Sequence, residues 1–269
     1  MKVNESFKNK VFISVVSHDH SKLIARLNVL KKLSNDENVI VLIKNNKKDE
    51  LIYDYIKGSN IHLIDQDYNN GFGYNNNLVF NYCSEKLGMQ EGDYFLVVNP
   101  DLIINLENIK NLVKKMETDK VSISTINLFK DEVFTIPDSS VRKFPGLYDF
   151  FSSFILKTNN TFIDKASIIK PVAIDWCAGS FIAFKVTAYK ALQGFNTRYF
   201  MYCEDVDICY RAKKMNIPII YYPDIIACHL AQHNNRKILS KHFFWHLRSA
   251  LYFLLSKRVG LKSKSNVVV

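Results

Sequence analysis

Asn99, Pro100 and Asp101 follow an apolar run at 94–98, and their side chains are suited to chemistry. A carboxylate placed just after a buried strand is a hard oxygen ligand for Mg²⁺ or Mn²⁺, which would be clamped to a diphosphate. The same residues also suit an ordinary turn that ends the strand, with Asp101 capping a helix from residue 105. The motif alone leaves both interpretations open.

Three carboxylates, Glu204, Asp205 and Asp207, lie in the stretch YFMYCEDVDICYRAKKMNIPIIYYPD at 199–224. They fall at the start of a predicted helix, 204–216, where the positive end of the helix dipole stabilises them. Bulky residues at 199–202 precede them directly, and a carboxylate beside such groups can have a raised pKa and act as a general base. A structural role and a catalytic role are both consistent with this pattern.

The elements that would position these residues alternate in the first half of the chain. Apolar runs at 11–16, 38–43, 61–64 and 94–98 predict buried strands, and helical spacing appears at 20–33, 75–88 and 106–116. Later segments at 171–184, 217–222 and 225–229 also resemble strands. This alternation predicts a parallel α/β sheet, which binds ligands at the carboxyl ends of its strands. Polar residues follow each of the first four strands, which predicts a cleft along that edge.

Two stretches are candidates for ligand binding, one that contains glycines and one that contains histidines. NNGFGYNNN at 69–77 has Asn76 where a dinucleotide fingerprint needs glycine, which excludes Rossmann dinucleotide binding. Its glycines could admit an anionic ligand at a helix start, or simply form an Asn/Gly turn and cap. Cys228, His229 and His233 lack the remaining residues of common zinc motifs, so His229 stays a candidate single metal ligand.

Two further pairs have both structural and functional interpretations. Asp175 and Trp176 suit a core tryptophan with a backbone-bonded carboxylate, or an aromatic wall with a carboxylate on a sugar hydroxyl. Arg142 and Lys143, in RKFP, suit a solvated loop or a grip on an acidic acceptor.

Charge gathers at the C-terminal end. The net charge is +10, and eight of the 36 Lys and Arg residues, but none of the 26 Asp and Glu residues, follow Asp224. A nucleic-acid enzyme more often lines its cleft with positive charge, so a basic tail favours an anionic surface. The tail, 241–266, mixes aromatic residues with helically spaced leucines, and its longest uncharged run, 249–256, is too short to span a bilayer. A membrane-interface helix and a helix docked on the core both fit.

Cysteine usage and the amino-terminal stretch indicate a cytoplasmic protein. The five cysteines form an odd set without a Cys-x-x-Cys pair, which suits a reducing compartment better than a disulfide framework. The first apolar run is too short for a signal peptide.

Together NNGFGYNNN, VVNPD, WCAGSFIAF, the stretch at 194–224 and CHLAQHNN resemble the family 2 glycosyltransferases with the GT-A fold, in that family's order. Within the family the chain is most similar to bacterial O-antigen rhamnosyltransferases that act on N-acetylglucosamine-diphosphate-undecaprenol. The resemblance implies an α/β GT-A fold, with a mostly parallel, Rossmann-like sheet flanked by helices and a C-terminal helical extension. The implied division is a transferase domain at 1–235, with a nucleotide-sugar half (1–130) and an acceptor half (131–235), followed by a basic, membrane-associating tail at 236–269.

The resemblance also implies roles for individual residues. Asp205 matches the catalytic base, Asp101 matches the last aspartate of the metal motif, and His229 completes that Mg²⁺ or Mn²⁺ site in some members. The residues implied for the nucleotide sugar are Ser17, Asn45, Asn70, Gly71, Gly73, Asn76, Asn99 and Asp175. Those implied for the acceptor are Arg142, Lys143, Trp176 and Glu204.

The implied reaction is an inverting transfer of L-rhamnose from dTDP-L-rhamnose to an undecaprenyl-diphosphate-linked sugar. It would take place at the anionic cytoplasmic face of the bacterial inner membrane, with no nucleic acid involved. One alternative is transfer of another sugar from a different sugar nucleotide. Another is a non-catalytic module that binds membrane or RNA through the tail. A nucleotidyltransferase would show a glycine-rich, basic loop after the first strand, and SHDHSKL is not one.

Overall fold

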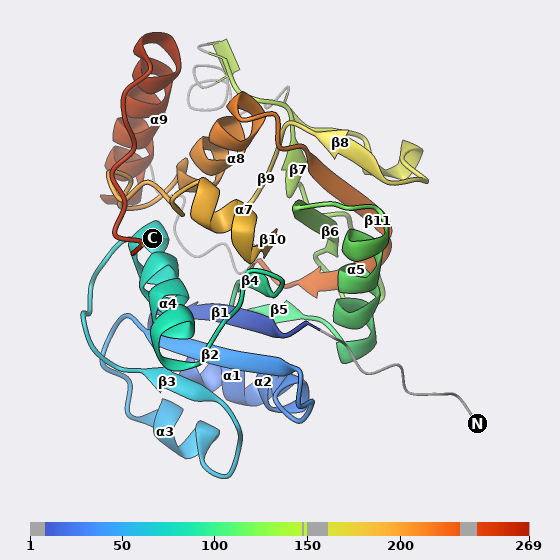
Figure 1. Ribbon diagram of the computed structural model, residues 1–269, viewed down its shortest axis with the longest axis vertical. Coiled ribbons are helices and arrows are strands. Elements are labelled where there is room, and N and C mark those ends of the chain that lie inside the picture. Colours follow the sequence, from blue (N-terminus) through green and yellow to red (C-terminus); the bar gives the residue numbers. More distant parts are fainter. Residues whose placement is uncertain (1–8, 147, 150–160, 232–240, 269) are drawn as a thin grey trace.

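A mixed sheet organises the part of the chain that the computed structural model describes, residues 9–146, 148–149, 161–231 and 241–268. The strand order is β3-β2-β1-β4-β10-β6-β11-β5, and β8 pairs with β11 (Figure 1). Parallel pairing joins β3, β2, β1 and β4, while β10 is antiparallel to both β4 and β6, and β11 is parallel to β6. The predicted, mostly parallel α/β sheet is therefore confirmed. The strands are β1 Val11–Ser17, β2 Val39–Asn45, β3 His62–Ile64, β4 Tyr94–Val98, β5 Leu102–Ile103, β6 Ile123–Phe129, β8 Val172–Ile174, β10 Phe181–Lys185 and β11 Ile219–His229, and a separate two-stranded sheet pairs β7 Val141–Arg142 with β9 Trp176–Cys177.

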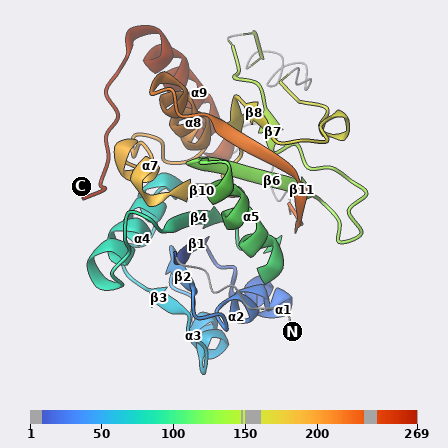
Figure 2. The same cartoon turned by 45° about the vertical axis from the view of Figure 1, so that its right-hand side comes forward.

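Side-chain alternation along the buried strands creates two apolar cores. In β1, Val11, Ile13 and Val15 face one core, and Phe12 faces the other. Strands that are apolar on both faces need helices on both faces, as in other parallel sheets. The first core is covered by α1 Ser21–Leu27, α2 Val29–Leu33, α3 Leu51–Ile56 and α5 Leu106–Thr118, and the second by α4 Phe72–Lys86, α7 Val186–Ala191, α8 Glu204–Lys214 and α9 Lys241–Val259 (Figures 1 and 2).

Four predicted elements differ in detail. The helix expected at 20–33 is two helices, because Asn28 adopts the left-handed conformation (φ 50°) between α1 and α2, which asparagine tolerates better than most residues. The two strands expected at 217–222 and 225–229 are one strand, β11, whose pairing with β6 shifts between Tyr222 and Ile226. Pro223 lies within that irregularity and has no N–H to donate to a ladder. The segment 171–184 forms three short strands, β8, β9 and β10.

Helix α9 packs on the loop that leads into α8. Phe253 and Ala250 are buried, and the Ser249 hydroxyl donates to the Met201 carbonyl oxygen at 2.9 Å. Aromatic contacts add to this packing, with ring centroids 4.8 Å apart for Trp245–Phe200 and 5.1 Å apart for Tyr252–Tyr199. The docked-helix interpretation of the tail is therefore confirmed for 242–259, whereas the proposed boundary at 235/236 lies outside the described residues.

Residues 260–268, here called the C-terminal strap, run back from α9 towards α4. The Asn266 Oδ1 accepts from the Asn77 side chain at 2.8 Å, and the Asn266 carbonyl oxygen accepts from Asn81 at 2.7 Å. The Lys264 carbonyl oxygen accepts from the Thr197 N–H at 2.7 Å. The strap thus joins α4 to the loop between α7 and α8.

Candidate active site

The carboxyl ends of β1, β2 and β4 meet at one edge of the sheet, as predicted. Ser17 and Asn45 end their strands as register partners, and the Asn46 N–H donates to the Ser17 carbonyl oxygen at 2.7 Å. Val98 pairs with Val15, so Asn99 lies almost level with Ser17. The structure therefore brings Ser17, Asn45 and Asn99 together.

The amide of Asn45 lies beside a carboxylate at the end of β3. Its Nδ2 donates to Asp65 Oδ1 at 2.8 Å, and its buried Oδ1 has no hydrogen-bond partner among the described residues. Burial acts to raise the pKa of Asp65, but hydrogen bonds from Tyr53 and Asn45 outweigh it and lower that pKa overall. Asp65 is a neighbour of the site that sequence reasoning placed at a strand end without assigning it a role.

The glycines of the 69–77 stretch are required by packing against the loop before α8. A Cβ on Gly71 would lie 2.4 Å from the Phe200 carbonyl oxygen, and one on Gly73 would lie 2.7 Å from the Phe195 Cβ. The Phe72 N–H donates to the same Phe200 oxygen at 3.1 Å. The absence of a side chain on these glycines therefore allows the two segments to pack closely. This packing accounts for glycine at both positions without the expected approach of a ligand to the backbone.

The asparagines of this stretch have two different environments. Asn76 is fully buried; it accepts from the Ser14 hydroxyl at 2.7 Å and donates to the Phe72 carbonyl oxygen. It joins α4 to β1 inside the core, which is a correction to its expected contact with the nucleotide. Asn70 is partly exposed near the strand ends and is held by paired hydrogen bonds with Asn46.

Asp101 and His229 are brought together by the pairing of β5 with β11. Leu102 is the register partner of His229, and the Leu230 N–H donates to the Asp101 carbonyl oxygen at 3.2 Å. As a result His229 Nε2 lies 3.4 Å from Asp101 Oδ1 and 3.3 Å from Asn99 Nδ2. The predicted metal residues are therefore neighbours.

Electrostatics at this pair favour charge on both partners. Burial raises the pKa of Asp101, but the hydrogen bond and charge of His229 outweigh it and lower that pKa overall. Burial lowers the pKa of His229, but hydrogen bonds to Asp101 and Asp138 outweigh it and raise the pKa to about 9.

The residues present fit a divalent ion that is completed by substrate. Within the described residues no group of three His, Cys, Asp or Glu side chains could hold a metal by itself. Mg²⁺ is commonly held by one or two carboxylates together with substrate phosphates and water, and an imidazole ligand suits a transition metal better. One carboxylate with one imidazole therefore fits Mn²⁺ on a diphosphate. His233 lies outside the described residues.

Asp205 is the second residue of α8, which begins directly after two residues in the left-handed conformation, Tyr202 (φ 70°) and Cys203 (φ 65°). Its Oδ2 accepts from the Gly179 N–H at 3.0 Å and its Oδ1 from the Val206 N–H at 2.9 Å. The carboxyl remains partly exposed to solvent. Its surroundings raise its pKa by desolvation, and the two backbone bonds and the charge of Arg142 limit that rise. A partly desolvated carboxylate of this kind can accept a proton.

Glu204 differs from its neighbour because it lacks such donors. It is buried, and its Oε2 has no hydrogen-bond partner among the described residues. Burial, followed by the nearby charge of Asp205, raises the pKa of Glu204 well above its usual value. The two carboxyls are therefore pushed apart in pKa, with Asp205 as the ionised member.

Arg142 is held against Trp176 near this carboxylate. The two residues are register partners between β7 and β9, and the guanidinium carbon lies 5.3 Å from the centre of the Trp176 ring and 4.8 Å from that of Phe162. Arg142 Nε also donates to the Ser139 carbonyl oxygen at 2.7 Å. The expected aromatic wall and cation are thus adjacent, and the Arg142 charge acts on Asp205.

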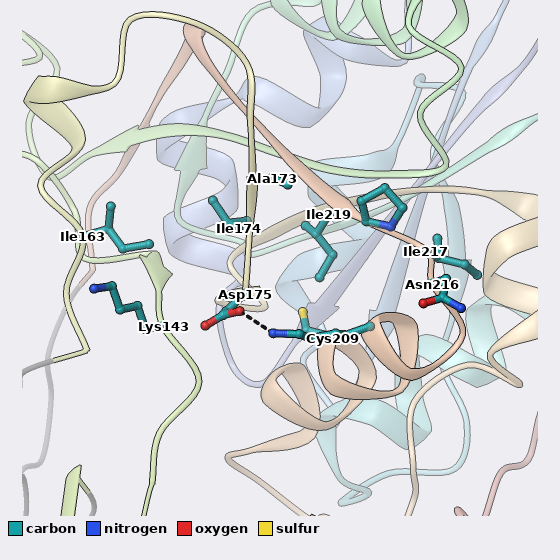
Figure 3. Close-up of a pocket in the computed structure, with 11 residues that line it drawn as sticks. Lys143, Ile163, Ala173, Ile174, Asp175, Cys209, Asn216, Ile217 and Ile219 are labelled. Carbon is teal, nitrogen blue, oxygen red and sulfur yellow. Dashed lines mark hydrogen bonds and ion pairs between the residues drawn. The ribbon is translucent and has the colours of Figure 1, made fainter.

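Lys143 and Asp175 lie elsewhere, in the wall of a cavity of about 640 Å³ between β8 and α8 (Figure 3). The Asp175 carboxylate pairs with Lys213 at 3.0 Å and accepts from the Phe144 N–H at 3.0 Å. Both oxygens are therefore engaged, and Asp175 does not join the strand-end residues as expected. The other lining residues are mainly apolar: Ile163, Ala173, Ile174, Cys209, Asn216, Ile217, Pro218 and Ile219.

Comparisons with known proteins identify the family of the chain. A model of the glycosyl transferase family 2 matches residues 17–188. The chain is 39% identical over 253 residues to the rhamnosyltransferase WbbL of Escherichia coli K12, covering 93% of this chain and 94% of that protein. It is 25% identical over 220 residues to an N-acetylglucosaminyl-diphospho-decaprenol L-rhamnosyltransferase of Mycobacterium tuberculosis, covering 75% of this chain and 69% of that protein.

A solved structure shares the fold at low identity. It is the mannosyltransferase PcManGT of Pyrobaculum calidifontis in complex with GDP-Man and Mn²⁺. The TM-score is 0.58 at 14% identity, over 96% of this chain and 67% of that one. This likeness confirms the GT-A fold.

Proposed function

Because the chain belongs to glycosyl transferase family 2 and is a glycosyltransferase, we propose that it transfers L-rhamnose from dTDP-L-rhamnose with inversion of the anomeric configuration. The proposed acceptor is an N-acetylglucosamine linked through a diphosphate to undecaprenol, in the synthesis of O-antigen or another cell-surface polysaccharide. The observation that carries this proposal is the match to a rhamnosyltransferase over nearly the full length of both chains. The N-acetylglucosaminyl-diphospho-decaprenol acceptor in the name of the mycobacterial relative supports a lipid-linked sugar as acceptor.

The chain's own residues would divide the work of a single displacement. Asp205 would take the proton of the acceptor hydroxyl while that oxygen bonds to the anomeric carbon, and the bond from this carbon to the diphosphate would break with its electrons on the diphosphate. Both Asp205 oxygens already accept backbone N–H groups, which orients the carboxylate and leaves it further lone pairs. Asp101 and His229 would hold Mg²⁺ or Mn²⁺, which supplies positive charge against the leaving diphosphate.

The nucleotide and the acceptor would lie on either side of this centre. Ser17, Asn45, Asn70 and Asn99 at the strand ends are the proposed nucleotide-sugar residues. Arg142, Trp176 and Glu204 are the proposed acceptor residues.

The direct test is a panel of sugar nucleotides with a lipid-diphosphate-linked N-acetylglucosamine, read by the release of nucleoside diphosphate. We expect dTDP-L-rhamnose to give the fastest release, and the release to depend on the acceptor. Faster turnover of a different sugar nucleotide would favour the alternative donor. Release from none of them would contradict the proposal.

We also propose that α9 lies on the anionic cytoplasmic face of the inner membrane. One side of α9 is buried against the core, and the opposite side presents an apolar stripe to the surroundings. Phe244, Leu247, Leu251 and Leu255 are 55%, 37%, 53% and 56% exposed and recur at helical spacing. Arg248 and Arg258 are exposed and lie on the same side of the helix. An apolar stripe flanked by cations suits a helix lying in a membrane interface. None of the described helices is long and apolar enough to cross a membrane.

Leu251→Asp should weaken co-sedimentation with phosphatidylglycerol vesicles and leave the melting temperature nearly unchanged, because Leu251 touches solvent rather than the core. The matched control is Leu51→Asp on α3, which is equally apolar, 49% exposed and changes the net charge by the same amount. Because α3 and α9 lie at opposite ends of the molecule (Figure 1), only the first substitution should matter. Equal binding of both variants would contradict the stripe. Deletion of the whole tail is a poorer test, since it also removes the buried Phe253.

A further inference from the structure

We propose that Asp138 is a positioning residue that fixes the ring of His229 so that its Nε2 lone pair faces Asp101 and the metal–diphosphate position. This inference rests on the proposed function, because it assigns a role within the proposed metal site. Asp138 comes to His229 through a return of the chain after β6. Pro137 bridges back to Phe129, and the Asp138 N–H donates to the Leu128 carbonyl oxygen at 2.9 Å.

The register of the sheet makes this position specific. Leu128 and Phe129 of β6 are the partners of Ala227 and Cys228 in β11. Because the backbone N–H of Asp138 bonds to Leu128, the Asp138 side chain can reach the end of β11, where it contacts His229. The return segment places a carboxylate on the side of the imidazole that faces away from Asp101.

The contacts of the ring distinguish its two nitrogens. Nδ1 lies 2.7 Å from Asp138 Oδ2, whereas Nε2 lies 3.4 Å from Asp101 Oδ1. An ionised carboxylate only accepts hydrogen bonds, so the neutral ring beside Asp138 carries its proton on Nδ1 and a lone pair on Nε2. In the assigned amide orientation Asn99 Nδ2 is 3.3 Å from Nε2, a donor facing an acceptor. Metal-bound histidines are commonly oriented by a carboxylate on the other ring nitrogen in this way.

Asp138 has a buried cation near it in addition to the imidazole. Its side chain is 14% exposed, and the charge of Lys165, which is 7% exposed, acts on it after that of His229. The Lys165 ammonium is anchored to the Leu128 carbonyl oxygen at 2.7 Å, the same oxygen that accepts the Asp138 N–H. The return segment thus delivers the carboxylate, while Leu128 of β6 anchors a cation that comes from the turn at Lys165–Ser167.

The test compares Asp138→Asn with Asp131→Asn. An asparagine at 138 nearly preserves the side-chain shape, but its Nδ2 can donate to Nδ1 and so permit the other tautomer. Asp131 lies at the far end of the same return segment, where it accepts from the Thr135 and Ile136 N–H groups without touching His229. If Asp138→Asn acted only by destabilising the return segment between Phe129 and Asp138, Asp131→Asn should have the same effect.

Two readouts separate positioning from folding. In the metal-free protein, at a pH where titration of the ¹⁵N signals themselves shows the ring to be neutral, the spectra of labelled histidine should show Nδ1–H in the wild type and in Asp131→Asn. Asp138→Asn should show a mixture of tautomers. Calorimetry of Mn²⁺ binding in the presence of dTDP should show a roughly 10–100-fold weaker affinity in Asp138→Asn, and a wild-type affinity in Asp131→Asn.

These experiments can contradict the role of Asp138 without contradicting the proposed transferase reaction. Wild-type tautomer and Mn²⁺ affinity in Asp138→Asn, with transfer intact in the wild-type enzyme, would overturn the positioning role and leave the transferase proposal standing. Equal weakening by both variants would show that the stability of the return segment is responsible and would also overturn it. Failure of the wild-type protein to bind Mn²⁺ with dTDP would overturn the metal site and this role together, whereas the tautomer shift is measured without metal.

Discussion

Asp205→Asn is expected to lower kcat by roughly 10²–10⁴-fold, the usual range for loss of a general base. The substituted amide keeps the size of the side chain but cannot take the proton of the acceptor hydroxyl. The affinity for dTDP should stay close to that of the wild type, because Asp205 lies at the start of α8 and not at the strand ends. The measurement is single-turnover transfer with saturating donor, beside calorimetric binding of dTDP.

One structural cost has to be separated from the chemical effect. Asn has a single acceptor oxygen, so one of the hydrogen bonds from Gly179 or Val206 is lost, which lowers the free energy of unfolding by about 1 kcal/mol. A melting curve measures that loss and shows the fraction folded during the assay. Near-normal turnover in a folded Asp205→Asn protein would remove this residue from the mechanism.

The charge of Arg142 allows a second test of Asp205 as the general base. Its charge lowers the pKa of Asp205, and the base works only when deprotonated, so activity falls as pH drops through that pKa. Arg142→Gln removes the charge, raises the pKa and should move the acidic limb of the rate profile to higher pH. Lys143→Gln is the control. Lys143 lines the cavity beside β8, and its charge is not among those that shift the pKa of Asp205. Identical limbs in wild type and Arg142→Gln would contradict the assignment.

Asp101→Asn should lower kcat at least about 100-fold, because charge stabilisation by a bound metal contributes several kcal/mol and each 1.4 kcal/mol is a factor of ten in rate. An amide keeps the turn after Asn99 but brings no charge to the ion. The wild-type enzyme should also lose activity in excess chelator and regain it with Mn²⁺ or Mg²⁺. The measurements are transfer rate and Mn²⁺ affinity on the same preparations.

The control for Asp101 is Asp36→Asn, which removes a carboxylate that pairs with Lys110 at the amino-terminal end of β2, where the Val39 N–H donates to the Asp36 carbonyl oxygen. It should leave rate and metal affinity unchanged. Full activity of the wild type in excess chelator would contradict a metal-dependent reaction. His229, with a pKa of about 9, would then be the cation placed to face the diphosphate, and Arg142 would be the second candidate.

The sequence predicted those site residues that belong to a regular element. Asp101 follows β4 and Asp205 lies in the first turn of α8, so apolar periodicity predicted where they stand, whereas the resemblance to the family implied their roles. Asp138 was missed because its place depends on a chain reversal and on the register of β6 with β11, which no local pattern encodes. Asp65 was seen at its strand end, but its partner Tyr53 comes from a separate helix.

Other residues were assigned by motif and placed differently by packing. Arg142 and Lys143 are neighbours in sequence, yet Arg142 stacks on Trp176 and Lys143 lines a separate cavity. Asn76 matches a loop motif, but one turn into α4 it faces β1. The pattern of the tail fits both a docked helix and a membrane-interface helix, because periodicity cannot separate two apolar faces of one helix. The docked face is confirmed, and membrane binding by the outer stripe remains a prediction.

The C-terminal strap has a consequence for the order in which the protein becomes complete during synthesis. Asp101, Asp205 and His229 have all been translated before Asn266, and Lys264 and Asn266 on the strap reinforce a link between α4 and the loop at 194–197 that Asn77 already makes directly to Phe195. While those residues are still inside the ribosome, the nascent chain holds every proposed catalytic side chain and the direct contacts of α4 with this loop, but it lacks the reinforcement by the strap. A premature stop codon at position 262 would therefore yield a polypeptide with an intact set of site residues and a more weakly held α4, and such an allele would be misjudged by inspecting the motifs alone.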